Sequence, residues 1–287
     1  IFRSKVKAKI RYIAEKLIKI AAERHLKKSD CFIPPQGMFD DFCSRFPYNE
    51  TDDQLNAIAD VLGDLGATIP MDRLVCGDVG YGKTEIAMRS AFKAVMGGKQ
   101  VAFLAPTTIL AEQHYENCVE RFKNFPVKIA HLSRFVTPAE QKKVLAKLAE
   151  GQVDVLVGTH RIIQKDVKYK NLGLMIIDEE QRFGVSQKEK IKELKTNVNV
   201  LTLSATPIPR TLHISLSGIR DISTIQTPPT NKQSTQVSVT EYSREAIKHA
   251  VDRELARQGQ VLIVYNRVEN IDAVAKQIKE IIGNNVV

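Results

Sequence analysis

The sequence predicts an α/β fold in which a parallel β-sheet carries helices on both faces. Short apolar, β-rich runs alternate with longer stretches of helical character, and a glycine-rich loop stands between one such run and the next helix. The runs are continuously apolar, which is typical of strands buried on both faces, and crossover helices are the usual connection between parallel strands. We therefore expect a doubly wound domain.

This main domain is expected to span residues 49–220. Six apolar runs predict its strands: Arg73–Cys76, Gln100–Leu104, Val127–Leu132, Val153–Val157, Leu174–Ile177 and Val198–Leu203. Five segments between them predict its helices: Asp53–Leu62, Lys83–Met96, Ile109–Phe122, Pro138–Glu150 and Gln187–Leu194.

Residues 1–48 are expected to form a long basic amphipathic helix, Ser4–Lys27, and a connector with a short helix, Cys31–Pro47. The formal charge of the chain is +9, and residues 1–28 hold ten Lys or Arg and two Glu. The helix thus carries +8 of this charge, so the overall charge does not argue that the main domain binds a polyanion. Its basic face fits a solvated surface, a phosphate contact or a contact with an acidic partner.

The C-terminal part is expected to hold a linker, residues 221–235, and then the start of a second α/β domain, residues 236–287. Pro228 and Pro229 mark the linker. The second domain is expected to contain a strand at Gln236–Thr240, a helix at Arg244–Arg257, a strand at Val261–Tyr265 and a helix at Ile271–Ile282. About fifty residues are few for such a domain, so we expect it to be incomplete and the chain to be a piece of a longer protein.

The composition of the sequence argues against a membrane-spanning protein and against a zinc site formed by cysteines. No apolar run approaches the roughly 18 to 20 residues that span a bilayer, so no membrane association is expected. The four cysteines, Cys31, Cys43, Cys76 and Cys118, have no zinc-binding spacing. We expect reduced thiols and a cytoplasmic location.

The glycine-rich loop Gly77–Thr84 fits the pattern G-x-x-x-x-G-K-[ST], directly after a predicted strand and before a predicted helix. Such a loop turns its backbone N–H groups onto phosphate oxygens, Lys83 neutralises phosphate charge, and the Thr84 hydroxyl is placed to bind Mg²⁺. The sequence therefore predicts an ATP site with Mg²⁺. Its residues are Gly77, Asp78, Val79, Gly80, Tyr81, Gly82, Lys83, Thr84 and Glu85.

An acidic box, Asp178–Gln181, follows the apolar run Leu174–Ile177. Acidic residues after a strand are often only turn or cap residues, but the ends of parallel strands meet at one crevice, so the box is expected beside the glycine-rich loop. Asp178 is expected to hold Mg²⁺, and Glu179 to orient or deprotonate the attacking water.

Two further polar segments belong to this predicted site. Ser204, Ala205 and Thr206 follow another apolar run and are expected at the same edge of the sheet. Gln54 precedes the loop in the chain, and its amide suits the edge of an adenine; an ordinary surface position on a helix is the alternative.

These motifs together resemble a known family. Their order is Gln54, CGDVGYGKTE (76–85), APTTILAEQH (105–114), VGTHRII (157–163), IIDEEQRFG (176–184), LSATPIPRTL (203–212) and VLIVYNRVENI (261–271). This order resembles superfamily 2 DNA helicases and translocases, and among them the RecG-like translocase module of bacterial transcription-repair coupling factors. The resemblance covers nearly the whole chain.

The resemblance implies a RecA-like first domain, the start of a second one, and roles for particular residues. Lys83, Glu179 and Gln181 would be catalytic, and Ser204–Thr206 would couple the nucleotide site to the DNA site. Contact with double-stranded DNA would run along its backbone without sequence specificity. The residues implied in DNA binding are Pro106, Thr107, Thr108, Gly158, Thr159, His160 and Arg161.

The function implied is that of an ATP-driven translocase on double-stranded DNA, which displaces stalled RNA polymerase at lesions and promotes nucleotide excision repair. RNA polymerase and the excision-repair proteins would bind domains outside this chain. Two alternatives remain: a RecG-type branch-migration helicase and, for the chain itself, a nucleotide-gated binding module. In this family arginines from the second domain complete the ATPase site, so we expect the chain to bind ATP and hydrolyse it poorly.

Overall fold

The computed structural model describes residues 22–24, 26–184, 186–188, 190–191, 198–206, 220–230, 232 and 237–283. The chain divides into two units, Ile1–Lys232 and Gln233–Val287. The predicted helix Ser4–Lys27 lies mostly outside the described residues, as do parts of the predicted helix Gln187–Leu194 and the segment 207–219.

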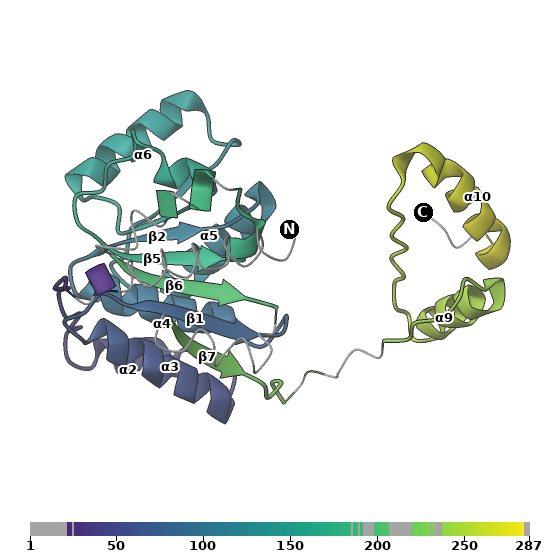
Figure 1. Ribbon diagram of the computed structural model, residues 1–287, viewed down its shortest axis with the longest axis horizontal. Helices are drawn as coiled ribbons and strands as arrows, with labels where there is room; N and C mark the ends of the chain where they lie inside the picture. The colour runs from purple at the N-terminus through teal and green to yellow at the C-terminus, as the bar shows by residue number, and fades with distance from the viewer. Residues whose placement is uncertain are drawn as a thin grey trace, which may run out of the picture. The chain divides into compact units, whose positions relative to one another are not determined.

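A parallel sheet of seven strands forms the centre of the first unit. Its order is β3-β4-β2-β5-β6-β1-β7, and every neighbouring pair is parallel. The labelled strands β2, β5, β6, β1 and β7 follow one another across the sheet in Figure 1. The strands are β1 Asp72–Gly77, β2 Gln100–Leu104, β3 Ile129–Leu132, β4 Val155–Gly158, β5 Leu172–Asp178, β6 Asn199–Ser204 and β7 Asp221–Ile225. The predicted parallel sheet is confirmed.

Helices cover both faces of this sheet, as predicted. Successive residues of one strand point to opposite faces, so Val101 and Phe103 of β2 join one apolar cluster, and Ala102 and Leu104 join the other. The first cluster includes buried residues of α2, α3, α4 and α5, and the second includes Leu148 of α6. These helices are α2 Met38–Ser44, α3 Asp52–Leu65, α4 Lys83–Met96, α5 Thr108–Phe122 and α6 Pro138–Glu150.

Local chemistry fixes where these helices begin. Thr51 and Gln54 form a capping box at the start of α3, and Thr137 and Glu140 form another at the start of α6. Each box satisfies backbone N–H groups that have no partner within the helix. The hydroxyl of Thr107 accepts from the N–H of Leu110 at the start of α5. The polar residues that precede these helices thus fix the first residue of each helix.

Strand β7 was not expected, because residues 221–225 were predicted to belong to a linker. It pairs in parallel with β1, with Asp221 opposite Arg73. Of the five residues of β7, only Ile222 and Ile225 are apolar, and the strand lies at the edge of the sheet. Ile225 and Ser223 are buried, and Ser223 donates a hydrogen bond of 2.7 Å to Asp60. An edge strand lacks the continuous apolar run that marks the central strands.

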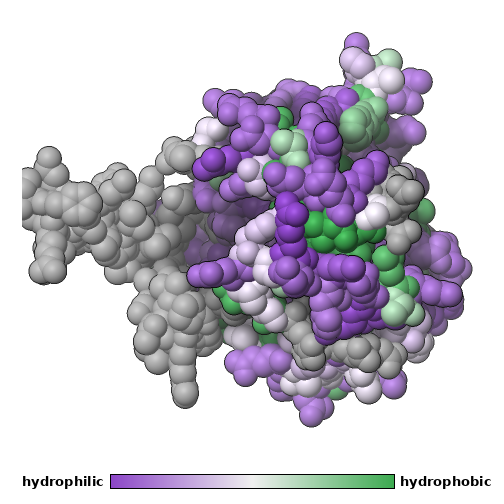
Figure 2. Space-filling view, turned by 90° about the vertical axis from the view of Figure 1, so that its right-hand side faces the viewer, coloured by the Kyte–Doolittle hydropathy of each residue, from purple (hydrophilic) through white to green (hydrophobic). Residues whose placement is uncertain are grey.

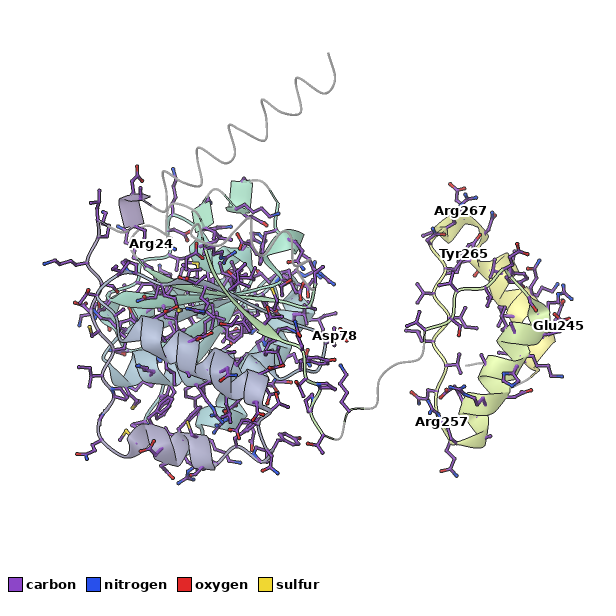
Figure 3. All side chains as sticks on the ribbon, turned by 60° about the horizontal axis from the view of Figure 1, so that its bottom comes forward. Arg24, Asp78, Glu245, Arg257, Tyr265 and Arg267 are labelled. Carbon is purple, nitrogen blue, oxygen red and sulfur yellow. The ribbon has the colours of Figure 1, made fainter. Side chains whose placement is uncertain are left out.

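In the second unit, the described residues 237–283 form the α-helices α9 Arg244–Ala256 and α10 Ile271–Ile282, with a short 3₁₀ turn, η3 Val268–Asn270, before α10. Glu245 and Arg257 mark the two ends of α9 in Figure 3. The strands predicted at 236–240 and 261–265 are wrong for the residues that the structure describes there, 237–240 and 261–265, which belong to no strand. An apolar run forms a strand only where a neighbouring strand makes hydrogen bonds with its backbone N–H and C=O groups.

The surface is hydrophilic over most of the face shown in Figure 2, where smaller apolar areas surround a larger one. Exposed apolar side chains of the second unit include Leu262, Val264 and Val268. None of the described helices combines the length and the apolar content that crossing a membrane requires.

Gly158, the last residue of β4, lies where the carboxyl edge of the sheet is closely packed. A Cβ atom there would lie 2.2 Å from the carbonyl oxygen of Leu132 and 2.5 Å from Cγ2 of Ile162. Because both neighbours are held by β3 and the turn after β4, we expect Gly158→Ala to lower the free energy of unfolding by about 2–3 kcal/mol. Chemical denaturation followed by circular dichroism measures this change.

Gly63 provides a matched control, since it lies within α3 and its Cβ would meet no atom within 4 Å. Gly63→Ala is expected to leave stability unchanged or to raise it by up to about 1 kcal/mol. Equal effects of the two substitutions would contradict the close packing described at Gly158.

Candidate functional site

The polar segments singled out in the sequence meet at the carboxyl edge of the sheet. Strands β4, β2, β5, β6 and β1 are consecutive neighbours, and all run in the same direction. Their ends carry, in that order, Gly158–Arg161, Pro106–Thr108, the acidic box, Ser204–Thr206 and the glycine-rich loop. The structure therefore brings these predicted segments together along one edge, the usual position of ligand sites in open α/β sheets.

The glycine-rich loop connects β1 to α4 with the backbone that its glycines permit. Gly80 and Gly82 have φ angles of +79° and +77°, in the left-handed region where other residues are strained. The side chain of Asp78 projects at the surface of the first unit in Figure 3. Helix α4 begins at Lys83, so the loop ends at a helix N-terminus, which favours a bound phosphate.

Lys83 turns its ammonium group back onto this loop. Its Nζ donates to the carbonyl oxygens of Gly77 at 2.6 Å and Asp78 at 2.9 Å. Burial lowers the pKa of Lys83 from its ordinary value, while the nearby carboxylates of Glu179 and Asp178 act in the opposite direction. The acidic box thus favours the charged form of the loop lysine.

Asp178, at the end of β5, is held by a histidine from α5. Oδ2 of Asp178 lies 2.8 Å from Nε2 of His114, and the His114 ring stacks on Phe103 with the ring centroids 4.5 Å apart. His114 is buried, so its position is fixed by packing as well as by the carboxylate. The sequence placed His114 inside a motif but gave no signal of this contact, which depends on the neighbouring strands β2 and β5.

Glu179 connects the acidic box to the segment after β6. It has a φ angle of 52°, unusual for a residue other than glycine, and its Oε1 accepts a hydrogen bond of 2.7 Å from the N–H of Ala205. Gln181 donates to the second carboxylate oxygen of Glu179. A direct hydrogen bond thus links the predicted catalytic carboxylate to Ser204–Thr206, within which Ser204 Oγ accepts from the N–H of Thr206 at 3.2 Å.

Arg220 is a second contributor that the sequence did not reveal. Its guanidinium lies 3.2 Å from Oε2 of Glu180 and 2.9 Å from Oδ1 of Asp72, and it also donates to the hydroxyl of Thr202. Burial lowers the pKa of Arg220, an effect that Glu180 opposes. Arg220 therefore connects the acidic box to β1 and β6.

Gln54 packs against the glycine-rich loop. Its Oε1 accepts from the N–H of Thr51 at 2.9 Å, and its Nε2 donates to the carbonyl oxygen of Tyr81 at 2.9 Å. One N–H of the amide remains for another partner. Gln54, Gly82 and Thr84 line a cavity of about 1380 Å³, which is large enough for a nucleoside triphosphate.

Glu85 follows the loop, but its carboxylate is bound by two arginines. Arg89 donates to Glu85 at 2.9 Å, and Arg121 donates at 2.8 and 3.1 Å. The Arg121 guanidinium also lies 3.8 Å from the ring centroid of Phe42. In this arrangement Glu85 ties α4 to α5 and to the segment of α2, and it is mostly buried.

The residues implied in DNA binding lie on two adjacent segments, which run from the end of β2 into α5 and from the end of β4 into the 3₁₀ turn His160–Ile163. The N–H of Ala105 donates to the carbonyl oxygen of Gly158 at 2.9 Å, which joins the ends of β2 and β4. Thr107 serves as the cap of α5, and Arg161 is paired with Asp166 at 2.6 Å. Asp166 is more exposed than Arg161.

Magnesium would need few protein ligands at this site. Among the described residues, no group of three or more His, Cys, Asp or Glu gathers as a metal cage. Mg²⁺ in nucleotide sites is commonly held by phosphate oxygens, water and one or two side chains, a role that Thr84 and Asp178 suit chemically.

A protein-family model described as "DEAD/DEAH box helicase" matches residues 51–214. The chain belongs to this family. The matched region contains the glycine-rich loop, the acidic box and the segment after β6. The segments that meet at the carboxyl edge of the sheet therefore belong to the part of the chain that this family shares.

Curated relatives include the transcription-repair-coupling factor of Bacillus subtilis, 54% identical over 280 residues, and that of Escherichia coli, 50% identical over 280 residues. Each alignment covers 98% of this chain and 24% of the relative. The chain therefore spans about a quarter of the length of these curated relatives.

Solved structures agree on the fold. RecG bound to a three-way DNA junction has a TM-score of 0.77 and 33% identity, covering 98% of this chain and 39% of that protein. The DEAD-box helicase Mss116 bound to single-stranded RNA has a TM-score of 0.56 at 14% identity, covering 78% of this chain and 51% of that one. The predicted RecA-like fold is confirmed by this family and these neighbours.

The buried carboxylate of Glu85 contributes to the stability of the fold through its two arginine partners. Replacing its buried carboxylate leaves Arg89 and Arg121 without their shared partner, and removal of one member of a buried ion pair typically costs about 3–5 kcal/mol. We expect Glu85→Gln, which keeps an acceptor oxygen, to lower the free energy of unfolding by about 2–4 kcal/mol. Denaturant titration measures this, with Glu116→Gln, an exposed position on α5, as the control.

Proposed function

We propose that this chain is the ATP-binding part of a motor that moves along double-stranded DNA. The observation that carries the proposal is the placement of the glycine-rich loop, the acidic box and Ser204–Thr206 at the ends of the neighbouring strands β1, β5 and β6. The hydrogen bond between Glu179 and Ala205 gives a direct physical route from the nucleotide to the segment after β6. A carboxylate that responds to the γ-phosphate would move that segment.

Within this proposal, each side chain has a role that its position supports. Backbone N–H groups of Gly80–Thr84 bind the phosphates, Lys83 leaves its carbonyl partners to neutralise them, and the amide of Gln54 faces the adenine. Thr84 and Asp178 hold Mg²⁺, which supplies charge neutralisation at the phosphates when it is bound. Glu179, assisted by Gln181, orients the attacking water.

The similarity to transcription-repair-coupling factors supports a more specific role. We propose that the whole protein displaces RNA polymerase stalled at DNA lesions and promotes excision repair in the cytoplasm, with partner proteins bound by other parts of it. A RecG-type branch-migration helicase is the second candidate, because the RecG structure matches 98% of the chain. Identity of 50–54% with the coupling factors, against 33% with RecG, favours the first.

Slow hydrolysis by these 287 residues is part of the proposal. Three arginines close to the motifs, Arg89, Arg121 and Arg220, are already hydrogen-bonded to Glu85 or Glu180. Arginine fingers are worth roughly 10³ to 10⁵ in the rate of phosphoryl transfer. We infer that another part of the whole protein supplies the guanidinium for the transferred phosphate, and that these residues by themselves turn over bound ATP near the background rate.

Lys83→Ala tests the nucleotide site. Removing a charged hydrogen-bond donor from the phosphates should weaken ATP binding about 10- to 100-fold, as measured by titration with a fluorescent ATP analogue. Affinity for duplex DNA without nucleotide should remain within about twofold. Undiminished ATP binding would show that the nucleotide lies elsewhere.

The same samples also report hydrolysis, through the release of inorganic phosphate. We expect a near-background rate with or without duplex DNA. A large stimulation by DNA would contradict slow hydrolysis, while ATP binding without any affinity for DNA would favour a nucleotide-gated binding module.

Arg161→Met tests the DNA-binding edge. Loss of one phosphate contact should weaken duplex binding about 3- to 10-fold for every sequence and reduce the slope of log affinity against log salt by about 1. Lys99→Met is the matched control, because Lys99 immediately precedes β2 and so lies at the opposite edge of the sheet, paired with Asp30. An equal loss in both variants would mean that only overall charge attracts the DNA.

A further inference from the structure

A lysine from the end of the first unit covers the outer side of the phosphate-binding loop. Nζ of Lys232 donates to the carbonyl oxygen of Val79, lies 3.8 Å from Oδ2 of Asp78 and lies 4.4 Å from the ring centroid of Tyr81. A Cβ atom built on Gly80 would lie 3.5 Å from the same nitrogen. One ammonium group therefore contacts or approaches each of the residues Asp78 to Tyr81.

The backbone before Lys232 is anchored near the loop. Oδ2 of Asp53 accepts hydrogen bonds from the N–H groups of Gln226 at 2.9 Å and Thr227 at 2.8 Å. The N–H of Lys232 donates to the carbonyl oxygen of Pro229 at 2.9 Å and closes a turn. Asp53 thus fixes residues 226 and 227 at the start of α3, next to Gln54, which itself contacts the loop.

This segment also forms a wall of the cavity at the nucleotide site. Pro229, Thr230 and Lys232 line the same cavity, of about 1380 Å³, as Gly82 and Thr84. Lys232 is partly buried, with 28% of its side chain exposed. Its charge is therefore screened less than that of a lysine surrounded by water.

We propose that Lys232 is a positioning residue of the nucleotide site, which fixes Asp78–Tyr81 of the loop and adds positive charge beside the bound phosphates. The proposal rests on the proposed binding of ATP at Gly77–Thr84. Two effects act in the same direction: a loop that is already fixed loses less conformational entropy on binding, and a nearby ammonium attracts a polyphosphate. Lys83 acts on the loop from α4, and Lys232 acts on it from the segment after β7.

The test compares Lys232→Met with Lys232→Arg in the full chain. Binding of methylanthraniloyl-ATP and methylanthraniloyl-ADP is measured by fluorescence titration, and binding of adenosine is measured by competition. We expect Lys232→Met to weaken both nucleotides about 3- to 10-fold and to leave adenosine unchanged. Lys232→Arg should restore most of the affinity, because a guanidinium also donates to a carbonyl and stacks on an aromatic ring.

Two control variants separate the role of Lys232 from a general effect of lost charge or lost stability. Lys142→Met removes the charge of an exposed lysine on α6 and should leave nucleotide affinity unchanged. Asp53→Ala removes the hydrogen bonds to Gln226 and Thr227 and should weaken ATP binding about 2- to 5-fold, whereas Asp52→Ala removes an acid from the same helical turn without that contact. The melting temperature of each variant, measured without nucleotide, confirms that it is folded.

The outcomes distinguish this inference from the proposed function. Unchanged or tighter ATP binding in Lys232→Met overturns the inference, and so does an equal loss for adenosine and ATP, since that would indicate general distortion of the cavity. If Lys83→Ala weakens ATP binding and Lys232→Met does not, only the role of Lys232 fails. If the unmodified chain binds no ATP, the proposed function fails, and the role of Lys232 fails with it.

Discussion

The parallel register of the sheet is the constraint on which the remaining structure depends. In a parallel sheet every strand presents the same end to the same edge, so residues more than 120 positions apart in the chain become neighbours. The loop after β1 meets the segment after β6 in this way, and β5 brings the acidic box beside them. Apolar residues that bury both faces of the strands thereby fix the spacing of the polar residues at their ends.

Buried charges in the first unit are arranged in matched groups. Glu85 is shared by Arg89 and Arg121, and Arg220 lies between Glu180 and Asp72. An unpaired charge in such surroundings would be costly, so each group must assemble as a whole. These groups join helix to helix and strand to loop. Their hydrogen bonds fix both the distance and the direction of each contact, which a non-directional apolar contact would not do.

Two cysteines, Cys76 and Cys118, are also buried in the first unit, but as neutral groups. Burial raises the pKa of Cys76 to about 11 and that of Cys118 to about 12, so both thiols stay protonated and unreactive. Lys83 differs from these thiols because it is a charged group that is buried next to acidic groups. The hydrogen bonds that it makes to described residues go to the carbonyl oxygens of Gly77 and Asp78. A buried cation placed this way is ready to exchange its carbonyl partners for an anion.

The sequence by itself determined the fold class, the central strands and the motifs of the nucleotide site. Continuous apolar runs mark strands buried on both faces, and the G-x-x-x-x-G-K-[ST] spacing carries its own backbone geometry, so both signals are local. Local signals failed at β7, an edge strand with polar residues, and at residues 261–265, whose apolar run has no pairing strand among the described residues. Only the tertiary structure decided the contacts of His114 with Asp178, of Arg220 with Glu180 and of Lys232 with Val79. Each of these contacts joins residues 40 or more positions apart, and whether they meet depends on the order of strands in the sheet, which no local pattern of residues encodes.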